Sequence, residues 1–188
     1  MTGEPPPQST RAAILVPFAL VTLIWGSTWL VIRDQLGIVP PSWSVTYRFV
    51  VAGLAMVVVA KVKGERFALD GRGWMFAAAI GLLQFCLNFN FVYRAEHHIT
   101  SGLVAVVFAI LLVPNALFAR VLLGQRMGGQ LIAGSAVAMA GIALLFVHEA
   151  RTGPAGTAAT LAGIGFTAMA ILAASMANVL QATPTARR

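Results

Sequence analysis

Six long apolar runs occupy most of the sequence, and each is close to the length that crosses a lipid bilayer. A hydrocarbon core about 30 Å thick needs roughly 20 apolar residues per helix. The strands of a membrane barrel would instead alternate in polarity over roughly ten residues, whereas these runs are longer and uniformly apolar. We therefore predict an all-α, polytopic membrane protein with six transmembrane helices, at Ala12–Ile32, Trp43–Ala60, Trp74–Tyr93, Ser101–Leu123, Leu131–Val147 and Ala158–Leu180.

The composition supports the same class of protein. Hydrophobic residues make up 59% of the 188 positions and charged residues only 10%, which is too little charge for the surface of a soluble domain. The formal net charge is +7, but the basic residues are scattered over separate loops and form no single patch of the kind that binds nucleic acid. We expect the lipid bilayer to be a partner and nucleic acid not to be one.

The N-terminal segment differs from a cleaved signal peptide. Residues 1–11 are mostly polar and rich in proline, and the first apolar run is followed by Arg33 and Asp34 rather than by a cleavage site of small residues. We predict a disordered cytoplasmic tail at residues 1–11 and a first helix that is retained.

The loop cations predict the orientation of the chain. Cytoplasmic loops of membrane proteins carry an excess of lysine and arginine. One side of the predicted bundle carries nine cations: Arg11, Lys61, Lys63, Arg66, Arg72, Arg120, Arg126, Arg187 and Arg188. The other side carries four: Arg33, Arg48, Arg94 and Arg151. We predict a multi-pass protein of the cell inner membrane with both termini in the cytoplasm.

No catalytic motif is found along the chain. It has neither a nucleophile elbow, nor a zinc-protease helix, nor a phosphate-binding loop. We therefore expect no enzyme activity, no cofactor and no metal site. All acidic residues are expected in tails or loops, which argues against a proton relay built on an embedded carboxylate. These residues are Glu4, Asp34, Glu65, Asp70, Glu96 and Glu149.

Three polar features fall inside predicted spans. Arg48, beside Tyr47, lies more than a turn inside the second span, where its cation either snorkels to the interface or faces an internal cavity that takes an anionic or zwitterionic substrate. Gln84 and Asn88 are spaced to share a face of the third span, where amides either join helices or line a polar path. Pro114 interrupts the fourth span, as a packing device or as a hinge.

Small residues are dense on two of the spans. They allow the backbones of neighbouring helices to approach closely inside a membrane, so we expect most of them to serve helix packing. On the fifth span they are Gly134, Ser135, Ala138 and Gly141, and on the sixth Gly163, Ala170, Ala173, Ala174 and Ala177.

Several short motifs recur in a fixed order along the first five spans. They are Trp25-Gly26-Ser27, Pro40-Pro41, Tyr47-Arg48-Phe49, Thr100-Ser101-Gly102-Leu103, Pro114, Leu123-Gly124-Gln125-Arg126 and Gly141-Ile142-Ala143-Leu144-Leu145. In their order and spacing the sequence resembles the EamA-type transporters of the drug/metabolite transporter superfamily. In one place it departs from that pattern, because Gln125 stands where an acidic residue is usual.

The resemblance implies two five-helix repeats of inverted topology, ten helices in all. Residues 12–147 would then form the first repeat, and residues 158–188 the first helix and flank of a truncated second one. In such transporters the substrate site lies near the midplane, where the two repeats face each other, and here four helices of the second repeat would be absent.

The function expected from this resemblance is a permease or exporter of a small polar metabolite or drug-like compound, working by alternating access and incomplete in this chain. The expected substrate-binding residues are Trp25, Arg48, Gln84 and Asn88, with Pro114 as a hinge. The alternative is a small membrane subunit that does not transport but assembles with itself, as a homo-oligomer, or with a partner.

Overall fold

The computed structural model describes residues 11–65, 69–152 and 156–183. Of the tail predicted at residues 1–11, residues 1–10 lie outside the described residues and Arg11 begins the first helix. Arg66 and the flank with Arg187 and Arg188 also lie outside them. Within them every regular element is a helix, and six helical stretches are long and apolar enough to cross a membrane. The all-α class and the six predicted spans are confirmed.

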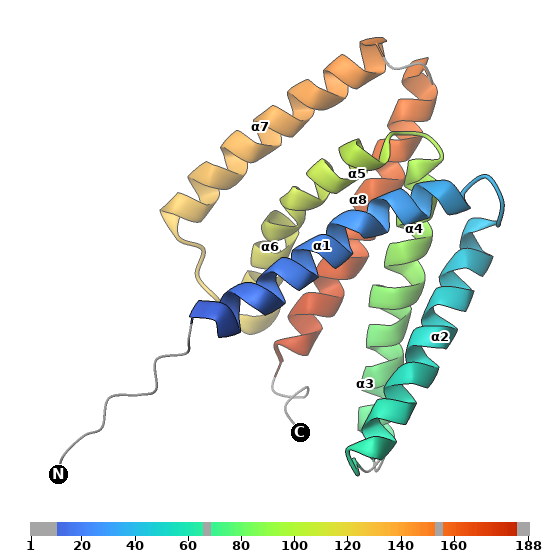
Figure 1. Cartoon of the computed structure of the whole chain (residues 1–188). Helices are drawn as coiled ribbons and strands as arrows, with labels where there is room; N and C mark the ends of the chain where they lie inside the picture. Colours follow the sequence, from blue (N-terminus) through green and yellow to red (C-terminus); the bar gives the residue numbers. More distant parts are fainter. Residues whose placement is uncertain (1–10, 66–68, 153–155, 184–188) are drawn as a thin grey trace.

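The third and fourth spans are each built from three consecutive helical segments, while the other spans are single helices (Figure 1). In the third span a π-helical segment, η1, joins two α-helices, and in the fourth a 3₁₀ segment, η2, does the same. In chain order the elements are α1 (Arg11–Gln35), α2 (Pro41–Val62), α3 (Gly71–Ile80), η1 (Gly81–Leu87), α4 (Asn88–Glu96), α5 (Ser101–Val107), η2 (Phe108–Leu111), α6 (Leu112–Leu123), α7 (Gly129–Thr152) and α8 (Gly156–Gln181).

The helix ends are set by capping groups. The Asp70 carboxylate accepts a hydrogen bond from the Gly73 amide at 2.8 Å and starts α3, and the Thr100 hydroxyl accepts one from the Leu103 amide and starts α5. Gly124 ends α6 with a φ of 67°, in the left-handed region that glycine adopts without strain. Pro41 occupies the first turn of α2, where its missing N–H costs nothing.

Most of the helices extend beyond the apolar runs that predicted them. Asp34 lies in α1, Glu96 ends α4 and Glu149 lies in α7, so the prediction that every acidic residue lies in a tail or loop is wrong for these three. The physical reason is that a helix stops where its backbone is capped, not where hydrophobicity falls. Polar residues next to the hydrocarbon core therefore continue the last helical turn.

Helix α8 forms the centre of the bundle. It packs against α4, η1, α6 and α7 (Figure 1), and the small residues predicted to pack on the sixth span are all buried. At Gly163 the backbone comes so close to the loop after α4 that a Cβ would lie 2.8 Å from a side-chain carbon of Ile99. By contrast, Gly134, Ala138 and Gly141 of α7 are exposed, so the predicted packing ridge on the fifth span is not buried.

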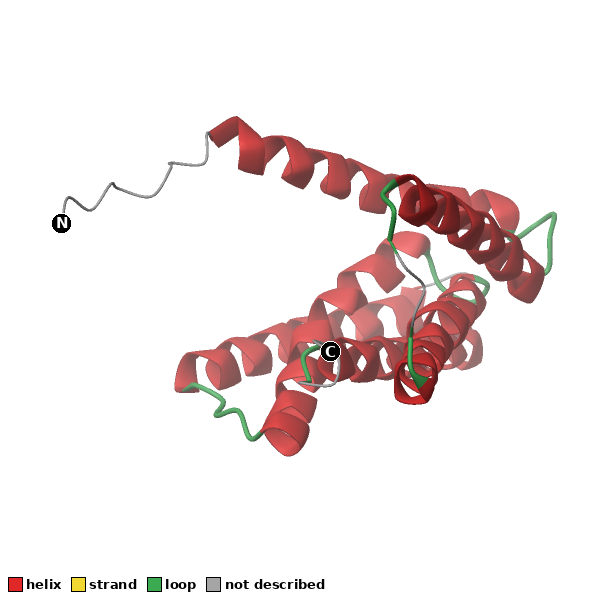
Figure 2. Ribbon diagram, turned by 90° about the horizontal axis from the view of Figure 1, so that it is seen from below, coloured by secondary structure: helices red, strands yellow, loops and turns green. Residues whose placement is uncertain are grey.

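Helices α1 and α2 lie at the edge of the bundle, and the N-terminal half of α1 projects away from the other helices (Figure 2). Their outward faces are apolar and open, with Phe18 69% exposed and Leu54 63% exposed. In water such surfaces would aggregate, but in a bilayer they face lipid chains. The faces that α1 and α2 turn toward each other carry polar side chains as well as apolar ones.

Candidate functional site

A cavity of about 490 Å³ lies between α1, α2 and α4. It combines polar side chains from more than one helix. The first span and the loop after it contribute Ile24, Ser27, Thr28, Val31, Gln35 and Val39; α2 contributes Ser44, Tyr47, Arg48 and Val51; and α4 contributes Tyr93.

The α1 wall follows one helix face: Ile24, the adjacent Ser27 and Thr28, Val31 and Gln35 recur at the three- to four-residue period of the helix. Two hydroxyls in this wall are already used inside the helix. Ser27 donates to the carbonyl oxygen of Ile24 at 3.0 Å, and Thr28 donates to the same oxygen at 2.8 Å. Because each hydroxyl has a single proton, both oxygens present only lone pairs to the cavity.

The α2 wall carries the cation. Arg48 is partly buried, and its guanidinium carbon lies 4.9 Å from the ring centre of Phe89 and 5.8 Å from that of Phe49. An aromatic face attracts a cation through its quadrupole, and the attraction grows when water is excluded. The two rings therefore support the charge from α4 and α2 while Arg48 lines the cavity.

The α4 wall is joined directly to α1. The Tyr93 hydroxyl donates to the side-chain oxygen of Gln35 at 2.8 Å, and Tyr93 is only 1% exposed. A second link runs from α2 to α4, where the Ser42 hydroxyl donates to the side-chain oxygen of Asn90 at 2.9 Å. These bonds fix the three walls relative to one another at the end of the bundle where α1 stops.

The predicted substrate residues fall in different places. Arg48 lies on the cavity wall. Trp25 is 66% exposed and does not line the cavity, although its neighbour Ile24 does. The part that each of these two plays in binding stays a prediction.

Gln84 and Asn88 lie in the part of the third span that packs against α8, away from the cavity lining. Asn88 is 5% exposed, and its amide nitrogen donates to the backbone oxygen of Gln84 at 3.3 Å. The side-chain oxygens of both residues are buried without a hydrogen-bond partner in the described chain. Their predicted contact with substrate therefore stays a prediction, since the structure does not bring them together with Arg48.

Pro114 lies in α6, one turn after the 3₁₀ segment η2. Proline has no N–H to return to the carbonyl of Ile110 in an α-helix or of Leu111 in a 3₁₀ turn. One of these carbonyls is bonded by another helix, because the Ser175 hydroxyl of α8 donates to the Leu111 oxygen at 3.4 Å. The change of helix type around the predicted hinge thus lies against α8.

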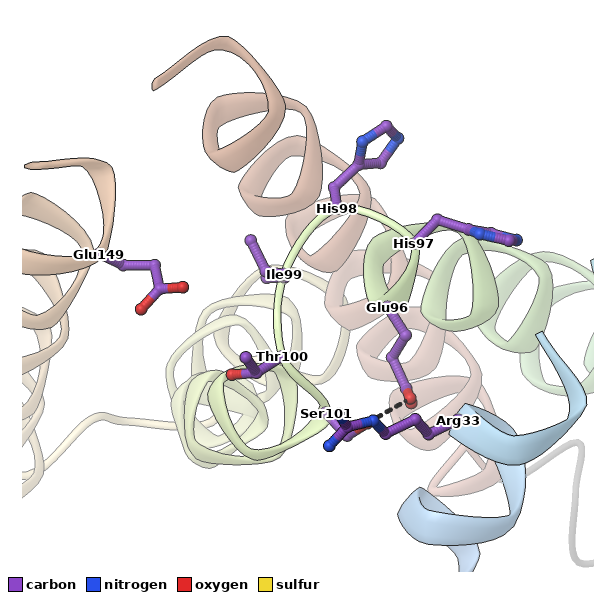
Figure 3. Close-up of a pocket in the computed structure, with 8 residues that line it drawn as sticks. All are labelled: Arg33, Glu96, His97, His98, Ile99, Thr100, Ser101 and Glu149. Carbon is purple, nitrogen blue, oxygen red and sulfur yellow. Dashed lines mark hydrogen bonds between the residues drawn. The ribbon is translucent and has the colours of Figure 1, made fainter. Parts of the chain in front are cut away.

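A smaller hollow of about 200 Å³ lies where α1, α4, α5 and α7 come together at one end of the bundle (Figure 3). The Ser101 hydroxyl donates to a carboxylate oxygen of Glu96 at 2.7 Å, and the other carboxylate oxygen is buried without a hydrogen-bond partner in the described chain. Figure 3 shows the Arg33 side chain extending from α1 toward this pair, while Glu149 of α7 lies on the other side of Ile99 and Thr100.

Sequence reasoning missed Gln35 and Ser44 as parts of the cavity. Ser44 stands one helical turn before Arg48, and that spacing alone could have placed it on the same face. Gln35 could not have been found in this way, because its place depends on how the end of α1 meets α4. No local sequence pattern predicts that Gln35 lines the cavity.

The chain matches the EamA-like transporter family over residues 12–147. The chain belongs to this family. The match covers the first five spans, including α1, α2 and α4, which form the cavity. It makes the protein a multi-pass member of a family of membrane transporters.

Curated relatives agree with this assignment. The chain is 26% identical to Protein PagO of Salmonella typhimurium, over 76% of this chain and 47% of that protein. It is 35% identical to the inner membrane transporter YedA of Escherichia coli (68% and 41%), and 33% identical to a probable terminal-alkyne amino-acid exporter of Streptantibioticus cattleyicolor (68% and 43%). The chain thus matches less than half the length of these relatives. No solved structure matches it.

Proposed function

We propose that the chain forms part of an inner-membrane permease that moves a small polar metabolite by alternating access, in the direction of export. The observation that carries this proposal is the cavity between α1, α2 and α4, with the Arg48 cation on its wall. A cation at membrane depth is costly, and it usually marks a substrate or ion pathway. Aliphatic residues and hydroxyls complete the walls, as in sites that hold small molecules.

The proposed domain organisation follows from the family. Residues 12–147 form one five-helix repeat, and residues 158–188 open a second repeat of inverted topology. Transporters of this kind bind substrate near the midplane between repeats and rock one repeat against the other. The central position of α8 against α4 and α6 suits a helix through which the two repeats engage.

The class of cargo is proposed from the site and from the named relatives. The cavity of about 490 Å³ has room for a metabolite of amino-acid size together with water. One relative is named as a probable amino-acid exporter. A small polar metabolite with a charged group is therefore the first class to test.

The test is a flux measurement with a transport-competent form of the protein, in which the second repeat is complete, reconstituted in liposomes loaded with a panel of radiolabelled amino acids and small organic acids. Efflux of at least one compound above empty liposomes is expected, and Arg48→Ala should abolish it. Loss of a transition-state or binding contact to a charged group of this kind costs about 1.5–3 kcal/mol, at least tenfold in flux. Arg94→Ala is the matched control, because Arg94 is an exposed cation on α4 outside the cavity lining.

The readout must include membrane insertion and yield for each variant. Flux lost at normal yield supports the proposed role of Arg48, whereas flux lost together with yield assigns Arg48 a structural role. No flux for any compound would contradict the transport proposal for this chain.

The second candidate is a membrane subunit that assembles with itself or a partner. One observation favours it: the small residues Gly134, Ala138 and Gly141 of α7 are exposed along one helix, and such ridges pack well against another helix. Crosslinking at Ala138→Cys, in a Cys86→Ser background, would give a defined dimer band if this reading is correct. The permease proposal expects no such band.

A further inference from the structure

Ser44 is a buried hydroxyl without a partner on the wall of the cavity. It is 6% exposed, and its oxygen has no hydrogen-bond partner within the described chain. The usual acceptor for a helical serine is the carbonyl one turn back, but the Pro40 oxygen already accepts from the amides of Trp43 and Ser44. A buried hydroxyl left unpaired costs about 1–3 kcal/mol, so its place beside a cavity calls for an explanation.

Ser44 and Arg48 are four residues apart on α2, which puts both side chains on the same face of the helix. Both line the cavity. The guanidinium carbon lies 4.9 Å from the centre of the Phe89 ring, and a ring attracts the cation without taking up its five N–H donors as a carboxylate would. The fork of guanidinium N–H donors suits a planar, two-oxygen acceptor.

Gln35 adds a third donor from α1. Its side-chain oxygen accepts the Tyr93 hydroxyl at 2.8 Å, which fixes the amide and leaves its NH₂ group as the part free to donate. None of the described residues that line the cavity is acidic. Ser27 and Thr28 present lone pairs to the cavity, whereas the Ser44 hydroxyl and the Gln35 NH₂ group can donate, and no carboxylate among the described lining residues pairs with Arg48.

We infer that Ser44, Arg48 and Gln35 form a carboxylate-binding subsite, so that the cargo is a small organic anion with an uncharged body. This inference rests on the proposed function for its biological meaning, but the binding itself does not depend on transport. The carboxylate oxygens accept from the Arg48 guanidinium, the Ser44 hydroxyl and the Gln35 amide. Val31 and Val51 of the facing walls contact the apolar body.

The experiment is isothermal titration calorimetry of the full chain in lipid nanodiscs at neutral pH, with empty nanodiscs as background. Three probes share one pentyl body and differ only in the head group: hexanoate carries a carboxylate, hexanamide a neutral amide, and pentylamine an ammonium. Acetate and butyrate vary the body length. Binding of a carboxylate is expected, with hexanamide at least tenfold weaker, because it lacks the charge, and with no binding of pentylamine, because Arg48 repels it.

Variants then locate the site. Arg48→Gln should abolish hexanoate binding, Arg48→Lys should weaken it by removing the two-point contact, and Ser44→Ala should weaken it about tenfold or more, as expected for one hydrogen bond to a charged group. Thr46→Ala is the matched control, because its exposed hydroxyl bonds only to the Ser42 carbonyl of its own helix.

The inference is overturned by no carboxylate binding at any body length, by equal binding of hexanoate and hexanamide, or by normal binding in Ser44→Ala. The proposed function can survive these outcomes if flux of another class of compound is observed. Conversely, carboxylate binding that depends on Ser44 in a chain without flux would support the subsite and contradict the proposal of transport.

Discussion

A cation inside a membrane helix needs compensation, and Arg48 receives it from aromatic rings rather than from a carboxylate. Phe89 of α4 and Phe49 of α2 lie under its guanidinium. Cation–ring attraction is worth about 0.5–2 kcal/mol, which is less than the cost of a centrally placed arginine on most scales. The rings therefore offset only part of the free-energy cost of placing Arg48 in the membrane. A ligand carboxylate could offset the rest, which would not be so for an arginine already paired with a carboxylate of the protein.

At Gly163 a single hydrogen in place of a side chain decides how α8 packs. A Cβ there would lie 2.8 Å and 2.9 Å from two side-chain carbons of Ile99 and 3.1 Å from the Cβ of His98. We expect Gly163→Ala to lower stability by about 1–3 kcal/mol, because the cost of overpacking exceeds the gain in helix propensity. Thermal unfolding in detergent measures this.

Gly165 of the same helix provides the matched control. Nothing lies within 4 Å of a Cβ built there, so Gly165→Ala should keep or slightly raise the midpoint of unfolding. Equal midpoints for the two alanine variants would contradict the close packing of α8 against the loop after α4.

At the scale of elements, the fourth span tests whether Pro114 acts as a hinge. Pro114→Ala restores an N–H near the 3₁₀ segment η2 and should add one backbone hydrogen bond, about 0.5–1.5 kcal/mol. If the segment around Pro114 moves during alternating access, this variant is at least as stable as the parent protein but slower in the liposome flux assay. Pro17→Ala, which changes a proline inside α1, should leave flux unchanged.

Unchanged flux in Pro114→Ala would assign the proline to packing alone. In that case the Ser175 hydroxyl serves to satisfy the Leu111 carbonyl near the proline. Flux therefore distinguishes a hinge from a packing role for Pro114, and the stability of the variant serves as the internal control.

The elements were predictable to the extent that hydrophobicity determines them. The fourth span was predicted with the bounds that it has, Ser101–Leu123, because Thr100 and Gly124 cap it where the apolar run begins and ends. The third span continues from Tyr93 to Glu96, since nothing caps it earlier. The charge of Arg48 inside an apolar span was enough to make it a candidate from the sequence. The position of Gln35 on the cavity wall depends on its contact with Tyr93, which no local sequence pattern encodes.

At the scale of the whole molecule, the two ends of the bundle differ in the charges that they carry. Arg33, Glu96 and Glu149 surround one hollow although they come from three different helices (Figure 3). This end carries the smaller number of cations in the sequence, and the opposite end carries Lys61 and Lys63. The asymmetry predicts that the end with the hollow faces away from the cytoplasm.

Reporter fusions test this orientation. Alkaline phosphatase, which is active only outside the cytoplasm, should be active when fused after Arg151 and silent when fused after Arg72. A reporter that fluoresces only in the cytoplasm should give the opposite result at the same two positions, which controls for expression. The reverse pattern would place the end with the hollow in the cytoplasm, and the direction of access to the Arg48 cavity would then have to be inverted. Activity of both reporters at both positions would mean that the charge bias does not fix a single topology, and two copies inserted in opposite directions would become a route to a complete inverted-repeat pair.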